Sequence, residues 1–442
     1  MATVCKFGGT STADGNILSC VKKIVEKDEK RQWIVTSAPG KRYAADVKVT
    51  DLLSDAYNAA KEGDRERYQT IFAKIEERYL SIVKETGGCA EFVKDVAEEI
   101  GEIRERIFVE KDEAYALSRG EYLIAKIAAR RFGLPFVDAT RVIFFGKDGR
   151  LDEERTYEAC RRVFKIERRA VVPGFYGVDE DGKIRTFSRG GSDVTGAILA
   201  RALGARTYEK WTDVSGFYPC DPKIVSGQSP VKQMTYDELN ALIETGAEVV
   251  HPYAAEIARG GGVTVRVRNT FRAEEEGTDI LPSVSEIDGR GDVTGIVVRR
   301  GRVLAVLKTA ENGEIKRAEE ILKRVGCEAN LFEKSAKELL FICAAKGEQR
   351  ERLKAALNEA FDGGKVVFSD DRAIVRMVGK RGFANADAQI EALKAVRAVG
   401  ESDARIYVSA AADVMTMVLR EESCERVASV LYRAFFEKEE KR

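Results

Sequence analysis

Up to about residue 285, the chain alternates between short apolar runs and longer stretches whose apolar residues have helical spacing. The runs Thr3 to Phe7, Trp33 to Thr36 and Ala170 to Pro173 each end in glycine or small polar residues. Helical patterns such as Asp14 to Lys27 and Glu153 to Arg168 lie between such runs. This alternation predicts an α/β domain with a mainly parallel sheet covered by helices on both faces. In such sheets, ligands bind beyond the carboxyl ends of the strands.

Three further predictions concern single elements of this first part. The run Phe136 to Asp138 is predicted to be a strand, and the charged stretch from about Arg65 to Glu110 is predicted to be helical. The turn residues Asp179 to Gly182 predict a hairpin between two short strands.

The character of the sequence changes after about residue 285. Ser283 to Asp292 is polar and contains glycine, as expected of a linker. An order of strand, helix, strand, strand and helix then occurs twice, and each copy has the size of a small α+β unit. We therefore predict a catalytic domain in residues 1–285 and two modules in residues 293–364 and 370–438. Such a duplicated unit can bind a small effector, or it can serve only to pair subunits.

The composition excludes several classes of function. The 73 Lys and Arg balance the 73 Asp and Glu, which gives no support for nucleic acid or a membrane surface as partner. No apolar run approaches the roughly 18 residues of a membrane span, and the first residues lack the regions of a signal peptide, so we expect a cytoplasmic protein. The eight cysteines form no C-x-x-C pair and are expected to be reduced thiols. A single histidine, His251, argues against a histidine-based metal site or several-histidine catalysis.

The segment Lys6-Phe7-Gly8-Gly9-Thr10-Ser11 connects a predicted strand to a predicted helix. Its glycines let backbone N–H groups approach phosphate oxygens, because no Cβ stands in the way. The helix start adds partial positive charge, and Lys6 can offset negative charge on a phosphoryl group in transfer. A plain strand-to-helix turn with a solvated lysine would have the same pattern. The segment does not have the spacing of a Walker loop.

A second strand, glycine pair and helix start occur between Thr186 and Asp193. Arg189 is suited to bidentate binding of a carboxylate or phosphate. Ser192 and Asp193 have the chemistry of a helix N-cap. The competing interpretation is a surface arginine beside an ordinary cap.

A third cluster, W-T-D-V-S-G-F-Y followed by D-P-K, contains Thr212, Asp213, Tyr218 and Lys223. Thr212 and Asp213 fall at the end of a predicted strand, where a carboxylate can align a Mg²⁺–nucleotide. Tyr218 and Lys223 can flank a base and a phosphate. A turn-rich loop with an aromatic anchor would have the same composition.

The fourth cluster is Ser118-Arg119-Gly120-Glu121. Glu121 is predicted to open a helix and can accept hydrogen bonds from a substrate ammonium group. Glutamate is common at helix starts, so a purely structural role is the alternative.

Together these motifs resemble the aspartate kinases of the amino acid kinase superfamily. The matching strings occur in the family's order over roughly the first 270 residues, and their joint match is far more specific than any one motif. They are K-F-G-G-T-S (6–11), S-A-P-G-K (37–41), V-T-D-L-L (49–53), S-R-G-E (118–121), V-P-G-F-Y-G (172–177), F-S-R-G-G-S-D-V-T (187–195), W-T-D-V-S-G-F-Y (211–218), D-P-K (221–223) and T-G-A-E-V-V-H-P (245–252). The string S-A-P-G-K-R and its spacing to V-T-D-L-L look like the clostridial branch.

The resemblance implies an αβα sandwich followed by two ACT modules. It implies ATP and Mg²⁺ as cofactors, L-aspartate as the acceptor and 4-phospho-L-aspartate as the product, the first step towards lysine, methionine and threonine. It implies that Lys6, Gly8, Gly9 and Asp193 serve the phosphates and the transfer step. Aspartate would be bound by Ser37, Thr50, Glu121, Arg189 and Ser192. The nucleotide site would be lined by Thr212, Asp213, Tyr218 and Lys223. In this interpretation Arg189 binds the α-carboxylate and Glu121 the α-ammonium group. No protein residue is assigned to a metal. No covalent intermediate is needed, because the acceptor carboxylate titrates at about 4 and is ionised at neutral pH.

The sequence departs from the family's pattern in several places. Glu248 stands where many relatives have a lysine that contacts nucleotide, and Lys223 stands where many have arginine. The glycine-bearing turn of effector-binding ACT modules is partly present at Gly379 to Gly382 and weakly at Lys308 to Gly313. Three alternatives therefore stay open: lysine as the effector, threonine as the effector, or no effector. Because ACT modules commonly pair across subunits, we expect a homo-oligomer, with a homodimer or a dimer of dimers as the prediction.

Two other functions fit the same sequence. One is a related kinase of the same superfamily that acts on another carboxylate such as glutamate, on a carbamate or on a nucleotide, and the other is a catalytically silent amino acid sensor. Ser37, Glu121 and Arg189, as a set for an amino acid, argue against a nucleotide acceptor. The presence of Lys6, Arg189 and Asp213 argues against a catalytically silent protein.

Overall fold

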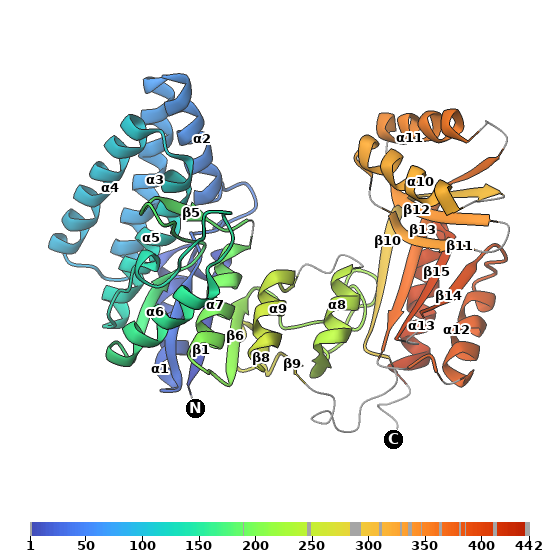
Figure 1. The fold of residues 1–442 in the computed structure, drawn as a ribbon. Coiled ribbons are helices and arrows are strands. Elements are labelled where there is room, and N and C mark those ends of the chain that lie inside the picture. The colour runs from blue at the N-terminus through green and yellow to red at the C-terminus, as the bar shows by residue number, and fades with distance from the viewer. Residues whose placement is uncertain are drawn as a thin grey trace. The chain divides into compact units, whose positions relative to one another are not determined.

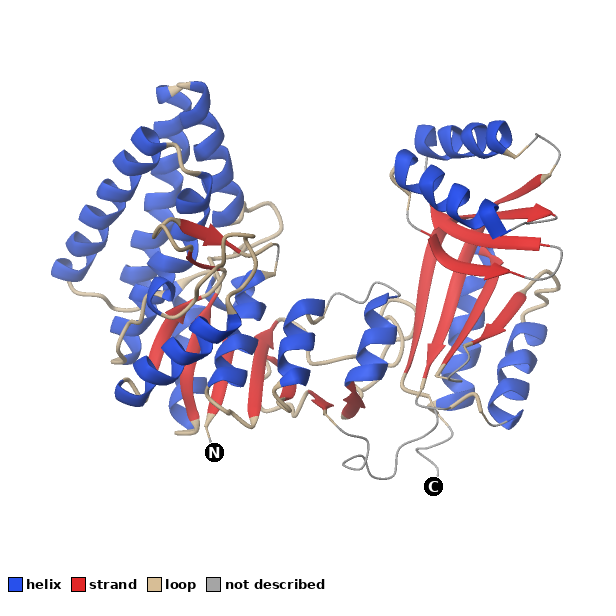
Figure 2. Ribbon diagram, viewed as in Figure 1, coloured by secondary structure: helices blue, strands red, loops and turns tan. Residues whose placement is uncertain are grey.

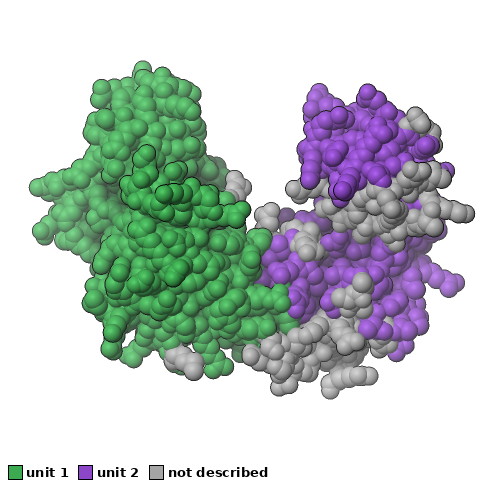
Figure 3. Space-filling view, viewed as in Figure 1, with its two compact units in different colours: residues 1–217, 230–236, 248–287 green, residues 218–229, 237–247, 288–442 purple. Residues whose placement is uncertain are grey.

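The computed structural model describes residues 2–188, 190–244, 249–282, 293–308, 312–327, 329–334, 338–345, 347–361, 365–379, 382–384, 386–409 and 413–437 of the 442-residue chain. The chain divides into two compact units (Figure 3). The first unit comprises residues 1–217, 230–236 and 248–287, and the second comprises residues 218–229, 237–247 and 288–442. Within the described ranges, no helix combines the length and the apolar character that crossing a membrane requires.

The first unit is built on a seven-stranded sheet in the order β3-β2-β1-β6-β8-β9-β7 (Figure 1). Its strands are β1 (Thr3–Phe7), β2 (Arg31–Thr36), β3 (Ala170–Pro173), β6 (Thr207–Thr212), β7 (Gln233–Thr235), β8 (Thr264–Asn269) and β9 (Thr278–Leu281). Neighbours from β3 to β8 are parallel, whereas β9 is antiparallel to β8 and β7 is parallel to β9. The mainly parallel sheet predicted from the alternating pattern is confirmed. The carboxyl ends of β3, β2, β1, β6 and β8 therefore lie along one edge of the sheet.

Helices cover both faces of this sheet (Figure 2). They are α1 (Gly15–Lys27), α2 (Val49–Glu62), α3 (Arg65–Glu85), α4 (Ala90–Glu110), α5 (Glu113–Phe132), α6 (Glu153–Ile166), α7 (Gly191–Ala202) and α9 (Pro252–Gly260), and α8 (Tyr236–Glu244) continues into the second unit. On β1, the side chain of Lys6 meets Asp193 of α7, while the next residue, Phe7, belongs to the apolar core formed with α1 and α5. Because successive strand side chains point to opposite faces, α7 lies on one face and α1 and α5 lie on the other.

Of the three predictions for single elements, two differ in detail from the structure and one is confirmed. The charged stretch from Arg65 to Glu110 forms two helices, because Gly87 adopts a left-handed φ of 75° and turns the chain between α3 and α4. Phe136 to Asp138 is not a strand: only Phe136 forms a bridge, to Val171 of β3. The predicted hairpin is confirmed as β4 (Tyr176–Val178) paired with β5 (Ile184–Thr186).

A buried ionic cluster lies on the sheet face that α1 covers. Glu209 of β6 accepts hydrogen bonds from Arg31 Nε at 2.8 Å, Trp211 Nε1 at 3.0 Å and Cys5 Sγ at 3.3 Å. A second guanidinium, that of Arg268, lies 3.7 Å from the same carboxylate. Burial alone would raise the pKa of Glu209, but the hydrogen bond and charge of Arg31 outweigh it and hold the pKa below its usual range. The cluster therefore depends on one carboxylate shared by two arginines.

The second unit contains a six-stranded antiparallel sheet in the order β11-β12-β10-β13-β15-β14. Its strands are β10 (Gly295–Lys308), β11 (Ala329–Lys334), β12 (Glu338–Ala344), β13 (Val366–Val378), β14 (Arg405–Val408) and β15 (Val414–Arg420). Its helices are α10 (Asn312–Val325), α11 (Gly347–Ala360), α12 (Ala386–Ala398) and α13 (Cys424–Phe435). The duplicated order of strand, helix, strand, strand and helix is confirmed.

The long strands β10 and β13 each take part in both copies of the duplicated unit. The first half of β10, Gly295–Arg299, pairs with the end of β13, whereas its second half, Arg302–Lys308, pairs with β12 on one side and with the start of β13 on the other. Ile296 accordingly packs in the apolar core of the second copy, while Val303 and Ala305 pack in the core of the first. The two copies are thus parts of one continuous sheet.

Candidate active site

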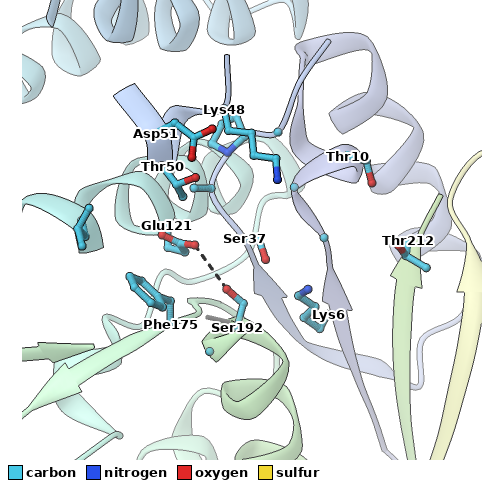
Figure 4. Close-up of a pocket in the computed structure, with 18 of the residues that line it drawn as sticks. Lys6, Thr10, Ser37, Lys48, Thr50, Asp51, Glu121, Phe175, Ser192 and Thr212 are labelled. Carbon is cyan, nitrogen blue, oxygen red and sulfur yellow. Dashed lines mark hydrogen bonds between the residues drawn. The ribbon is translucent and has the colours of Figure 1, made fainter. Parts of the chain in front are cut away.

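A cavity of about 760 Å³ opens at the carboxyl ends of β1, β2 and β6, beside the first turn of α7. This is the edge of a parallel sheet at which ligands are expected. Figure 4 shows Lys6, Ser37, Thr50, Glu121 and Ser192 around it. The site residues predicted from the sequence that line the cavity are Lys6, Gly8, Gly9, Ser37, Thr50, Glu121, Ser192, Thr212 and Asp213.

The remaining predicted residues lie elsewhere. Asp193 is not at the cavity surface but directly beneath it, in contact with Lys6. Tyr218 and Lys223 belong to the second unit, so their nucleotide roles stay predictions. In that segment Cys220 is buried in the apolar core of the second ACT-like copy. Arg189 lies outside the described residues, as does Glu248.

The glycine loops after β1 and β2 touch each other through their backbones. The N–H of Gly40 donates to the carbonyl oxygen of Gly9 at 2.8 Å, and a Cβ on Gly40 would lie 2.8 Å from the Gly9 carbonyl group. Absence of side chains is therefore what allows the two loops to close the cavity floor. The N–H of Gly8 donates to the carbonyl oxygen of Trp211 at 3.0 Å. A ligand can therefore approach the backbone of Gly8 closely, but the N–H of Gly8 is already paired with Trp211 and is not available to the ligand.

Asp193 is held between two lysines under the cavity. Lys6 Nζ lies 2.7 Å from Asp193 Oδ1, and Lys210 Nζ donates a hydrogen bond to Asp193 Oδ2. All three side chains are at least nine-tenths buried. Burial alone would raise the pKa of Asp193, but the charges of Lys210 and Lys6 outweigh it and hold the pKa below its usual range. Asp193 is therefore ionised across the physiological range.

The N-cap predicted for Asp193 is wrong. Helix α7 begins at Gly191, and its N-cap is Gly190, which has a left-handed φ of 85° that glycine adopts without strain. Asp193 instead lies in the first turn, where its side chain faces the sheet and meets the two lysines. The N-cap Gly190 and the first-turn residues Gly191 and Ser192 also line the cavity, and a helix N-terminus there favours an anion.

Glu121 lies in the middle of α5 and does not open a helix as predicted. The helix starts eight residues earlier because the carboxylate of Asp112 accepts a hydrogen bond from the N–H of Tyr115 at 3.0 Å and caps it. Ser192 Oγ donates to Glu121 Oε1 at 3.5 Å, while the buried Oε2 has no hydrogen-bond partner among the described residues. Burial raises the pKa of Glu121 to about 7. A buried carboxylate oxygen of this kind suits a ligand that brings its own N–H donors.

Replacement of Glu121 by glutamine is expected to change the pH dependence of stability. In the folded protein the pKa is about 7 against an ordinary 4.5, so the stability that the neutral carboxyl contributes is complete below pH 4.5 and is lost as pH rises through 7. This loss is on the order of 3 kcal/mol, and glutamine, which does not ionise, removes it. The substrate-free variant should therefore melt at a higher temperature than the parent at pH 8, with little difference at pH 4.5.

Thermal melts at both pH values test this expectation. Glu98→Gln is the matched control, because Glu98 is an exposed glutamate on α4 and should leave the pH dependence unchanged. A parent protein and a Glu121→Gln variant that lose stability equally between the two pH values would contradict it.

A carboxylate and a hydroxyl lie together at the end of β6. Thr212 Oγ1 donates to Asp213 Oδ1 at 3.1 Å, and Asn269 Nδ2 donates to the carbonyl oxygen of Asp213 at 3.2 Å, which fixes this turn. Asp213 is exposed and lines the cavity, so its second carboxylate oxygen suits a hard cation such as Mg²⁺.

Within the described part of the chain, sequence reasoning missed four charged residues that line the cavity, namely Lys41, Lys48, Asp51 and Lys210. Lys210 could have been found by pairing β1 and β6, because each of these two strands ends in one of the sequence motifs. Aligning the ends of β1 and β6 places Lys6 and Lys210 directly opposite each other, as the observed register shows.

Comparison with known proteins agrees with this architecture. Residues 1–269 match the model of the amino acid kinase family. Aspartokinase 3 of Bacillus subtilis is 29% identical over 98% of this chain and 98% of its own length. The crystal structure of Clostridium acetobutylicum aspartate kinase is 30% identical, covers 98% of this chain and 99% of its own, and superposes with a TM-score of 0.89. E. coli aspartokinase III in complex with lysine and aspartate, at 22% identity and a TM-score of 0.78, has the same fold. The chain therefore belongs to the amino acid kinase family, and within it to the aspartate kinases, with C-terminal ACT-like modules.

Proposed function

We propose that this chain transfers the γ-phosphoryl group of ATP to the β-carboxylate of L-aspartate and forms 4-phospho-L-aspartate. The observation that carries the proposal is a single cavity in which Lys6, backed by Asp193, lies across from the buried acid Glu121. The first supplies positive charge to a phosphoryl group, and the second supplies a carboxylate to an amino acid's ammonium group.

We propose the following division of roles. Glu121, Ser192, Ser37 and Thr50 bind aspartate around the α5 side of the cavity, with Arg189 as the partner of its α-carboxylate. Gly9 and the start of α7 face the phosphates, and Thr212, Asp213, Tyr218 and Lys223 serve the nucleotide.

The reaction brings two anions together, so positioning and charge compensation are the main tasks of the protein. Asp213 would hold Mg²⁺ on the nucleotide phosphates, and the ion would offset part of their negative charge when bound. Lys6 stabilises the charge on the group in transfer. The protein needs no base, because the acceptor carboxylate is already ionised.

We further propose that the enzyme acts in the cytoplasm, as a homo-oligomer, at the head of lysine, methionine and threonine synthesis. The domain division into residues 1–285, 293–364 and 370–438 is part of the same proposal. A solved relative contains lysine and aspartate, which supports an amino acid effector, and lysine and threonine are the two candidates.

The test is a hydroxamate assay for the acyl phosphate, run with ATP and Mg²⁺ and with aspartate, glutamate or acetylglutamate as acceptor. We expect turnover with aspartate, and lysine and threonine are then added in turn to reveal feedback inhibition. Turnover with another carboxylate only would favour a related kinase. Binding of lysine in a calorimeter without any turnover would favour an amino acid sensor.

A further inference from the structure

Among the described residues that line the cavity, Lys210 is a buried charge to which the proposed roles assign no task. It lies on β6 directly opposite Lys6 of β1, and both side chains point to the face covered by α7. Like charges at opposed positions on neighbouring strands repel each other, and burial adds a desolvation cost to each ammonium group. Because repulsion and desolvation both oppose a buried lysine at position 210, we expect Lys210 to have a function that compensates for them.

A purely structural role does not account for this arrangement. Lys6 alone would neutralise Asp193, so the second lysine leaves the trio with one net positive charge. Apolar neighbours of Lys210, such as Tyr208 and Trp211, show that the strand otherwise carries large buried side chains. A hydrophobic residue would therefore suit position 210 better if the only task were packing.

The surplus charge faces the cavity. Lys6 and Lys210 both line it, although each side chain is at least nine-tenths hidden from water. Charges in such a setting are poorly screened and act strongly on a ligand that displaces the remaining water. The positive charge that Asp193 leaves unbalanced favours an anionic ligand in the cavity, and a phosphoryl group is such an anion.

We propose that Lys210 is a second catalytic lysine, which contacts the phosphoryl group in transfer together with Lys6, while Asp193 holds both ammonium groups in place. This inference rests on the proposed kinase function. An oxygen of the acceptor carboxylate forms a bond to the γ-phosphorus as the bond from that phosphorus to the β,γ-bridging oxygen breaks, and ADP leaves. Both lysines keep their protons and stabilise the charge on the phosphoryl oxygens. Asp193 is a positioning residue in this scheme.

The decisive variant is Lys210→Met, which keeps most of the length of the side chain and removes its charge. Because Asp193 stays paired with Lys6, the variant should fold. We expect kcat to fall about 100-fold with little change in the KM for aspartate, as for loss of one charge-stabilising donor. Affinity for ADP with aluminium fluoride, Mg²⁺ and aspartate should fall by a similar factor, while affinity for ADP alone stays the same.

Lys126→Met is the matched control. Lys126 lies on α5, pairs with Glu99 at 2.5 Å and does not line the cavity, so this variant should keep parental kinetics. A Lys210→Met protein that is less stable but has an unchanged kcat per folded molecule would overturn the inference and assign Lys210 a structural role. Absence of aspartate phosphorylation by the parent protein would instead reject the proposed function itself.

Lys210→Arg keeps the inference testable if the methionine variant does not fold. The charged groups that act on Lys210 are Lys6 from β1, Asp193 from α7 and Asp213 beyond β6. Burial lowers the pKa of Lys210, Asp193 opposes this change, and Lys6 adds to it. Arginine does not deprotonate, so the variant should keep part of the activity and retain it to higher pH than the parent. An identical alkaline limb of kcat in both proteins would count against a role for the Lys210 charge.

Discussion

Replacement of Lys6 by methionine is expected to lower kcat about 1,000-fold while the protein stays folded. Lys6 is the lysine of the first glycine motif; it lines the cavity, and its ammonium group pairs with Asp193 of α7. In a reaction between two anions, removal of such a charge is felt in the transition state more than in substrate binding. The fold is retained because Asp193 still pairs with Lys210.

Steady-state kinetics with aspartate and ATP, together with circular dichroism, test this expectation. The loss should appear in kcat and in kcat/KM alike, because the contact forms mainly in the transition state. Lys126→Met is again the control for the substitution itself. A folded Lys6→Met enzyme with near-parental turnover would remove the basis of the proposed mechanism.

Replacement of Glu209 by alanine is expected to destabilise the first unit by about 3 to 5 kcal/mol, the usual effect of leaving a buried charge unpaired. Arg31 is 6% exposed, so removal of its carboxylate partner leaves a guanidinium that water cannot solvate. Arg268 loses the same partner. The cluster lies on the sheet face opposite Lys6, so kcat of the folded enzyme should change little.

Unfolding in denaturant measures this loss, with activity assayed at a temperature where the variant is folded. The double variant Glu209→Leu with Arg31→Met provides the comparison, because it replaces the closest ionic pair by apolar side chains of similar volume. It should recover much of the stability that Glu209→Ala loses. If Glu209→Ala lowered the free energy of unfolding by less than about 1 kcal/mol, the two arginines would not depend on the Glu209 carboxylate as proposed.

The fold could be predicted from the sequence because its signals are local. Apolar runs that end in glycine or small polar residues predicted β1, β2 and β3, the motif at Thr212 and Asp213 predicted the end of β6, and the repeated pattern predicted the elements of the second sheet. The lengths of β10 and β13 were missed, since residues 295–302 and 366–372 have few apolar side chains in strict alternation. Their extension comes from pairing with each other, which is a long-range property.

The candidate active site could likewise be predicted only where its signals are local in the sequence. Lys6 and Thr212 were found because they lie within motifs at strand ends. Glu121 was identified but placed at a helix start, because the cap at Asp112 is nine residues away and the intervening sequence carries no break. Lys210 was missed because its importance comes from the strand beside it and not from its own neighbours in sequence.

The shared strands of the second sheet have a consequence for evolution and engineering. Since β10 and β13 each supply backbone to both repeats, neither repeat is a cassette that can be cut out or exchanged between proteins. A graft made at the boundary of one repeat would import half a strand and leave the other half without its neighbour. Exchange of regulatory properties between proteins would therefore require transplanting both repeats together.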